Sequence, residues 1–494
     1  MLSPLVALIV VLLYFGALIL ISYLTSKDEV SNTSFFQANK SAPWYLVAFG
    51  MIGASISGVT FISIPGWVST NQFSYMQTVL GYLAGYAVIA LVLMPMYYKL
   101  NLVSIYSYLE QRFGTNAYKT GSAFFLLSRT TGSSFRLFLM AIVVQKFIVL
   151  DVIPFWATVA VIILLIWIYT HRGGIKTIIW TDTLQTFFLI LSLIMTIYLI
   201  GSKMEFSLGT MVSSVFDSDY SQIFYFESGW SDPKNFFKQF FAGAFICITM
   251  SGLDQDIMQK NLACKNIGEA QKNMFWFSIL LVLVNFLFLM LGALLYIYAA
   301  EFSIEIPSKI VAGIEKPNTD LLFPTIALGH LSQIVGIFFL LGIIASTYAS
   351  SDSALASLTT AFCVDFLNFK KLENEGKNTV KIRNYVHLGF SFLLFLVILI
   401  FWKINDDAVI ESLFKTAGFT YGPLLGLFAF GFYTKWKIND KWVLPICLLS
   451  PILTYILNMY SEQILFGYKF SFELIIINGL LTFLGLFLIR KKNG

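Results

Sequence analysis

Residues 43–69 read PWYLVAFGMIGASISGVTFISIPGWVS, an apolar stretch of membrane-spanning length that glycines and serines interrupt near its middle. A second apolar stretch, residues 236–256, carries Gly243, Ser251 and Gly252 and runs into the polar segment LDQDIMQKN. Paired broken helices at matching positions of two repeats indicate a midplane binding site in a secondary transporter. The alternative is that these glycines only let neighbouring helices pack closely.

The composition excludes a water-soluble globular protein. Of 494 residues, 57% are hydrophobic and 12% are charged, and the mean hydropathy is +0.77. The chain is therefore predicted to be an all-α polytopic membrane protein with about thirteen transmembrane helices. These are expected near residues 4–24, 43–69, 74–98, 120–146, 152–170, 175–202, 236–256, 272–299, 331–364, 384–402, 409–433, 442–459 and 471–489.

The helix positions predict the organisation of the chain. Five helices fall in residues 43–202 and five in residues 236–433, and an odd number in each block makes the two blocks inverted repeats. A helix and loop precede them in residues 1–42, an external loop covers 203–235, and two more helices occupy 434–494.

Charge placement predicts the orientation. No Lys or Arg precedes the first span, and Lys27 follows it, which indicates a retained helix with the N-terminus outside. Most of the 32 Lys and Arg residues then lie in internal loops, Lys260, Lys265 and Lys272 among them, and the C-terminus lies in the cytoplasm. The net charge of +5 thus reflects topology, and no nucleic acid is expected as a partner. The four cysteines form no motif of a disulfide framework or zinc site.

Asp182 stands inside an otherwise apolar span, roughly 12 Å along the helix predicted for 175–202. An acid there is costly unless it has a partner or faces water, so it marks a candidate functional site. Thr177, Thr181 and Gln185 surround it with oxygen atoms at helical spacing, which suits a small hard cation. The alternative is an acid held by an arginine of a neighbouring helix for assembly alone.

The helix predicted for 331–364 carries a second intramembrane acid, Asp352. Four of its serines share one face: Ser346, Ser350, Ser353 and Ser357. Small residues of this kind also make close-packing faces, but the carboxylate favours an oxygen-lined cation path. Backbone carbonyls freed at the break near residues 53–56 could complete such a site.

Two arginines, Arg129 and Arg136, point the same way from the helix predicted for 120–146. They either balance Asp182 and Asp352, or one of them binds an anionic group of a solute. The three histidines form no metal-binding or catalytic motif, so an enzyme is not expected.

Five stretches together resemble the sodium/solute symporter family, which includes bacterial galactose, proline and sialic acid transporters. They are GGIKTIIWTDTLQ at 173–185, GASISGVTFISIPG at 53–66, DQDIMQKNLACKN at 254–266, SSDSALASLTTAFCVDF at 350–366 and YGPLLGLFAFGFYTKW at 421–436. The resemblance covers nearly the whole chain. It implies the inverted five-helix repeat of the leucine-transporter fold, with one extra helix before the core and two after it.

The resemblance also implies two sodium sites. The main site would use backbone oxygens of Gly53, Ile56 and Ser346 and hydroxyls at the positions of Ala349 and Ser350. Ala349 departs from the family's usual Ser or Thr, so one hydroxyl ligand is missing. A second site resembles the group Asp182, Asp352 and Ser353. Asp352 supplies a carboxylate where sialic acid transporters carry a serine, which is expected to strengthen this site.

The implied solute site is similar to that of the sialic acid transporters at Ser57 and Thr60. Gln77 lies one turn earlier than the family's glutamine. Arg129 and Arg136 flank Gly132, the position of the family's carboxylate-binding arginine, by about one turn on either side. A solute-binding group of Ser57, Thr60, Gln77, Arg129 and Arg136 follows from this comparison.

The expected function is that of an inner-membrane symporter, in which the sodium gradient drives import of a small polar organic solute by alternating access. The solute would be a sugar, a sugar acid or an amino acid. Its partners would be the solute, Na⁺ and the lipid bilayer, and a monomer is expected. A proton-coupled carrier of the same fold is the main alternative, and a sensor or channel on this scaffold is a weaker one.

Overall fold

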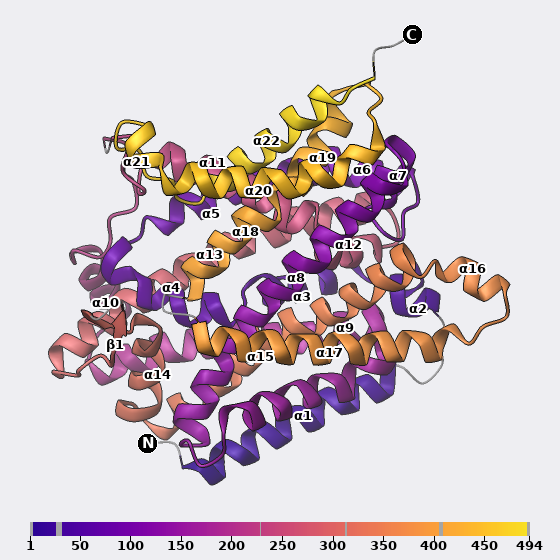
Figure 1. Cartoon of the computed structure of the whole chain (residues 1–494). Helices are drawn as coiled ribbons and strands as arrows, with labels where there is room; N and C mark the ends of the chain where they lie inside the picture. The colour runs from indigo at the N-terminus through magenta and orange to yellow at the C-terminus, as the bar shows by residue number, and fades with distance from the viewer. Residues whose placement is uncertain (1–2, 26–31, 228, 312–313, 405–408, 492–494) are drawn as a thin grey trace.

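The computed structural model describes residues 3–25, 32–227, 229–311, 314–404 and 409–491. The fold is a bundle of helices, with one short β-hairpin in the described part (Figure 1). The helices are α1 Pro4–Thr25, α2 Asn32–Gln37, α3 Trp44–Ser55, α4 Gly58–Asn71, α5 Tyr75–Val88, α6 Met94–Lys99, α7 Ser107–Arg112, α8 Thr115–Val143, α9 Phe155–Lys203, α10 Leu208–Phe216, α11 Phe236–Cys247, α12 Gln255–Leu262, α13 Ile267–Glu301, α14 Leu322–Thr325, α15 Gln333–Ala361, α16 Phe369–Asn374, α17 Thr379–Ile404, α18 Val409–Thr420, α19 Gly422–Tyr433, α20 Val443–Met459, α21 Ser461–Ile464 and α22 Leu474–Leu488. The hairpin pairs β1 Ser308–Val311 with β2 Ile314–Pro317 in antiparallel register.

Eight helices of the described residues are long and apolar enough to cross a membrane, and two bent pairs raise the number to ten. Three shorter apolar helices, Phe155–His171, Gly422–Tyr433 and Leu474–Leu488, accompany them. This establishes a multi-pass helical membrane protein. The number thirteen and the inverted repeat stay predictions. Lys27 and Lys492, two of the charges behind the predicted orientation, lie outside the described residues.

Both predicted helix breaks are confirmed. Helices α3 and α4 meet at an angle of 56°, and Ile56 and Ser57 between them leave the helical conformation. The second break separates α11, with its π-helical end η4 Ile248–Gly252, from α12 at an angle of 64°. Glycines and serines permit these breaks because they place little side-chain bulk where the backbone leaves the helix.

Helices α9 and α15 form the centre of the bundle and pack extensively against each other. Helix α9 bends at Gly174, whose φ of 54° favours glycine, and only its second half carries the acid Asp182. Helix α3 packs against α9 and α15, so the first break lies beside both central helices. Figure 1 shows the extra helix α1 and the C-terminal pair α20 and α22 on opposite sides of the bundle.

Candidate functional site

The first break exposes a row of backbone oxygens. The amide of Ile56 donates to the carbonyl of Ile52 at 2.7 Å, and the helical pattern resumes where Phe61 donates to Ser57 at 3.0 Å. The carbonyls of residues 53–56 therefore lie at a helix end, where intrahelical partners run out. Such oxygens are suitable ligands for a sodium ion.

Glycines bring the neighbouring helices close to this break. A Cβ atom on Gly53 would lie 2.4 Å from Oγ1 of Thr186 on α9, and the Gly53 amide donates to that hydroxyl at 3.0 Å. A Cβ atom on Gly58 would lie 2.3 Å from Oγ1 of Thr347 on α15. Both positions require glycine because a side chain would separate α3 and α4 from α9 and α15.

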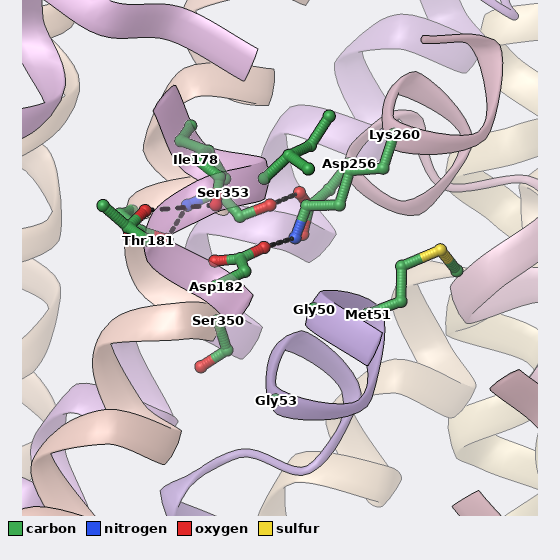
Figure 2. Close-up of polar contacts among 12 residues, drawn as sticks. Gly50, Met51, Gly53, Ile178, Thr181, Asp182, Asp256, Lys260, Ser350 and Ser353 are labelled. Atoms are coloured by element: carbon green, nitrogen blue, oxygen red, sulfur yellow. Dashed lines mark hydrogen bonds and ion pairs between the residues drawn. The ribbon is translucent and has the colours of Figure 1, made fainter. Parts of the chain in front are cut away.

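Ser346 and Ser350 of α15 are the predicted hydroxyl-bearing neighbours of this break. The hydroxyl of Ser346 donates to the Ile343 carbonyl at 3.1 Å, and that of Ser350 donates to the Thr347 carbonyl at 3.0 Å. Each hydroxyl oxygen keeps lone pairs that can bind a cation, because its one proton is directed into its own helix. Ala349 is fully buried between them and offers no side-chain oxygen. Figure 2 shows Ser350, Gly53 and Asp182 grouped around the same space.

Asp182 is paired with a lysine that the charge pattern of the sequence places in an internal loop. Its Oδ2 lies 2.6 Å from Nζ of Lys260 on α12, and both side chains are 1% exposed (Figure 2). The expectation that Lys260 belongs to an internal loop is wrong, because α12 continues the second broken helix into the protein interior. The other oxygen, Oδ1, is buried without a hydrogen-bond partner among the described residues.

The other two members of the predicted second sodium site are also engaged. Asp352 accepts a hydrogen bond from the Tyr169 hydroxyl at 2.9 Å and one from the Ser353 amide at 2.5 Å. The Ser353 hydroxyl donates to Asp256 on α12 (Figure 2). Asp182, Asp352 and Ser353 thus lie around one buried polar cluster, to which α12 adds Asp256 and Lys260.

Arg129 is held by acids of the second broken helix. Its guanidinium pairs with Asp256 and lies 3.9 Å from Asp254, and it also donates to the Ser350 carbonyl at 3.4 Å. Asp254 in turn accepts a hydrogen bond from the Tyr421 hydroxyl at 2.5 Å. Arg129 therefore joins α8 to α12 and α15, and its acidic partners are neither Asp182 nor Asp352.

Arg136 faces a cavity and is the unpaired one of the two arginines. Its side chain is buried, and its Nε and Nη1 atoms have no hydrogen-bond partner within the described chain. The cavity, with a volume of about 90 Å³, is bounded by the first break, α5, α8, the second broken helix, α13 and α18. Ser57, Thr60 and Arg129 line it beside Arg136.

Gln77, the remaining predicted solute residue, lies outside this lining. Its amide donates to the Lys234 carbonyl at 2.9 Å and to the Gln239 side chain at 3.0 Å, and it accepts from the Tyr225 amide at 3.0 Å. These bonds fasten α5 to α11 and to the segment before it. Gln77 therefore holds these elements together.

Several cavity and cluster residues carry no signal that singles them out in the sequence of their own segment. They are Lys260, Asp254, Asp256, Tyr169, Tyr421, Asn285 and the tyrosines Tyr75, Tyr82 and Tyr86. Asp256 and Lys260 are the exception, because they are four residues apart in LDQDIMQKN, which places them on one face of a helix.

The model of the sodium:solute symporter family matches residues 35–441, and the chain belongs to this family. It is therefore a sodium-coupled membrane symporter and not an enzyme.

Named relatives agree with this class. The sodium/sialic acid symporter NanT of Aliivibrio fischeri is 25% identical over 436 residues, which cover 85% of this chain and 82% of that protein. The sodium/sialic acid symporter SiaT of Proteus mirabilis is 23% identical and covers 85% and 83%. The sodium/glucose cotransporter of Vibrio parahaemolyticus is 22% identical and covers 95% and 89%.

The fold also matches a solved structure. The substrate-bound, outward-open structure of a Na⁺-coupled sialic acid symporter superposes with a TM-score of 0.80 at 20% identity, covering 99% of each chain. Mhp1, a nucleobase-cation-symport-1 transporter with bromovinylhydantoin bound, gives a TM-score of 0.52 at 13% identity and covers 93% and 95%. Both likenesses concern the fold alone.

Ala349→Ser tests the missing ligand at the predicted main sodium site. A hydroxyl there would add an oxygen ligand next to Ser346 and Ser350. We therefore expect the sodium concentration for half-maximal uptake to fall, by roughly tenfold if the oxygen acts as one added ligand. Sodium dependence of uptake in proteoliposomes measures the change. Ala349→Cys, similar in size with a soft sulfur atom, is the matched control and should leave the constant near wild type. An equal fall in both variants would assign the change to packing.

Proposed function

We propose that this symporter uses an inward sodium gradient to import a small organic solute that carries an anionic group, and that Arg136 binds this group. The single observation that carries the proposal is Arg136 itself, a buried guanidinium with unpartnered nitrogen atoms on the central cavity. A buried unpaired cation is costly, and a carboxylate on the solute would satisfy it with charge-assisted hydrogen bonds. Sugar acids and amino acids meet this requirement, whereas neutral sugars do not.

The charges of the buried cluster support sodium as the coupling ion in the second site. Four carboxylates, on Asp182, Asp254, Asp256 and Asp352, outnumber the three buried cations of this region, which are the paired Arg129 and Lys260 and the cavity-facing Arg136. An excess of negative charge in a low-dielectric interior favours binding of monovalent cations. We therefore propose one sodium ion near Asp182, Asp352 and Ser353, and another near Gly53, Ile56, Ser346 and Ser350 with Ala349 as the missing ligand.

Coupling then follows from binding linkage. The break at residues 56–57 contributes carbonyls to the proposed main sodium site and Ser57 to the solute cavity. An ion that orders this break therefore also orders the solute site, and by reciprocity the solute raises sodium affinity. Alternating access would be a movement of the two proposed repeats, residues 43–202 and 236–433, around this fixed region.

The proposed placement is the inner membrane, with the N-terminus outside, the C-terminus in the cytoplasm and a monomer as the working unit. The excess of Lys and Arg in the loops assigned to the inside supports this orientation. The excess of positive charge remains when Lys260 is not counted among these loops, because Lys265 and Lys272 lie on the same side of the predicted topology.

The test is uptake by proteoliposomes that contain the purified protein. A thermal-shift screen against sugars, sugar acids and amino acids, with and without sodium, first selects the solute. Uptake should then require an inward sodium gradient, and a carboxylated solute should compete while its neutral amide does not. Full uptake with potassium outside and only a proton gradient would contradict sodium coupling. Equal transport of the acid and its amide would contradict the role of Arg136.

A further inference from the structure

Lys260 occupies the position on Asp182 where the proposed second sodium ion would bind. Its Nζ atom lies 2.6 Å from Asp182 Oδ2, within the distance of a strong charge-assisted hydrogen bond. Both groups are almost completely buried, so water cannot stand in for either charge. Removing one partner of such a pair would leave the other charge uncompensated.

Two further acids lie near enough to act electrostatically on the same ammonium group. They are Asp256 and Asp352, in addition to Asp182. Asp256 precedes Lys260 by four residues on α12, so the two side chains lie on one face of that helix. Asp256 is therefore an alternative acidic partner for the ammonium group on its flexible four-carbon stem.

Helix α12, which carries Lys260, also contacts two other helices of the bundle. It follows the 64° break of the second broken helix, and Asp256 on the same helix contacts Arg129 on α8 and Ser353 on α15. A shift of Lys260 away from Asp182 would thus change contacts of the helix that joins the central bundle to α8. The arrangement has two discrete partners for one charge, which is the requirement for a two-state coupling element.

We propose that the Lys260 ammonium group is a tethered cation that holds Asp182 in the absence of sodium, and that sodium binding at Asp182 displaces it toward Asp256. The inference rests on the proposed second sodium site. It adds that the site is autoinhibited by a charge of the protein itself. Sodium affinity at Asp182 is then lowered by competition, and each binding event moves α12.

The test measures sodium binding by thermal unfolding of the purified protein, with sodium chloride titrated against choline chloride, and compares it with the sodium dependence of uptake. In Lys260→Gln the competitor is gone. The unfolding midpoint in choline should fall because Asp182 is uncompensated, and the sodium concentration for half-maximal stabilisation should fall about tenfold. Lys238→Gln is the matched control, since Lys238 is likewise buried and pairs with Glu473 at 3.4 Å. It should lower the midpoint and leave the sodium constant unchanged.

Lys260→Arg keeps the test decisive if the glutamine variant fails to fold. The arginine retains the positive charge and can hold Asp182 with two hydrogen bonds, so the sodium constant should rise. An unchanged sodium constant in Lys260→Arg, or an unchanged or raised constant in a folded Lys260→Gln protein, would overturn the tethered-cation proposal. The proposed second sodium site would survive these outcomes if sodium stabilises the wild-type protein and Asp182→Asn weakens that stabilisation. Absence of any sodium stabilisation of the wild type would instead overturn the proposed function, and this inference with it.

Discussion

Arg129→Gln is expected to remove most of the folded transporter from the membrane. The guanidinium of Arg129 pairs with Asp256, lies 3.9 Å from Asp254 and reaches the Ser350 carbonyl, all in the buried interior. Its loss leaves two buried carboxylates short of a counter-charge, and breaking a buried pair in this way costs about 3–5 kcal/mol. Stability of a native protein is about 5–15 kcal/mol, so this single loss removes a large part of it. The measurements are the yield of monodisperse protein in detergent and its unfolding midpoint.

A paired change should restore the folded protein. In Arg129→Gln/Asp256→Asn, the amide of residue 256 can still accept from Ser353, and one of the two uncompensated carboxylates, the one that pairs directly with Arg129, is gone. Recovery of yield in the double variant, with Asp256→Asn alone also destabilised, would establish the pair as a structural tie. A well-folded Arg129→Gln protein with a raised solute constant would contradict this assignment and make Arg129 a solute ligand.

The spans and both breaks could be predicted because their signals are local. Apolar runs of spanning length and clusters of Gly and Ser belong to one stretch of chain each, and the breaks at residues 56–57 and before α12 appear where those residues stand. Asp182 could likewise be singled out from its own helix, because an acid in an apolar span is costly wherever the other helices lie.

The partners of these residues could not be predicted, because they come from segments far apart in the sequence. Lys260 is 78 positions from Asp182, and Asp256 is 127 positions from Arg129. Lys260 also lies in the polar segment that follows an apolar stretch, where a lysine usually indicates a loop. Only the 64° bend at the second break, which directs α12 back into the bundle, makes it an interior residue.

The two arginines of α8 look equivalent in sequence but differ in their surroundings. They are seven residues apart and share one face of the helix. Arg129 pairs with acids of α12, whereas Arg136 lines the cavity. Their different surroundings lead to different expectations for the same substitution. Loss of Arg129 should act on folding, whereas loss of Arg136 relieves the burial of an unpaired cation and should leave the fold intact or slightly more stable.

Arg136→Gln should therefore yield a folded protein that has lost most of its affinity for an acidic solute. Truncating one member of a buried, hydrogen-bonded charge pair costs about 2 kcal/mol or more, which corresponds to roughly a 30-fold rise in the apparent solute constant. Uptake of the carboxylated solute over a concentration series measures this constant, and stabilisation by sodium in the absence of solute should stay near wild type.

Arg136→Lys is the matched control, because it keeps the positive charge and removes the planar fork that binds both oxygens of a carboxylate. It should lie between wild type and Arg136→Gln in solute affinity. The neutral amide of the same solute should show the reverse order, since its binding to wild type leaves the Arg136 charge unpaired and its binding to Arg136→Gln does not. An unchanged solute constant in both variants, together with normal sodium stabilisation, would remove Arg136 from the solute site and leave the neutral cavity residues Ser57 and Thr60 to define the substrate.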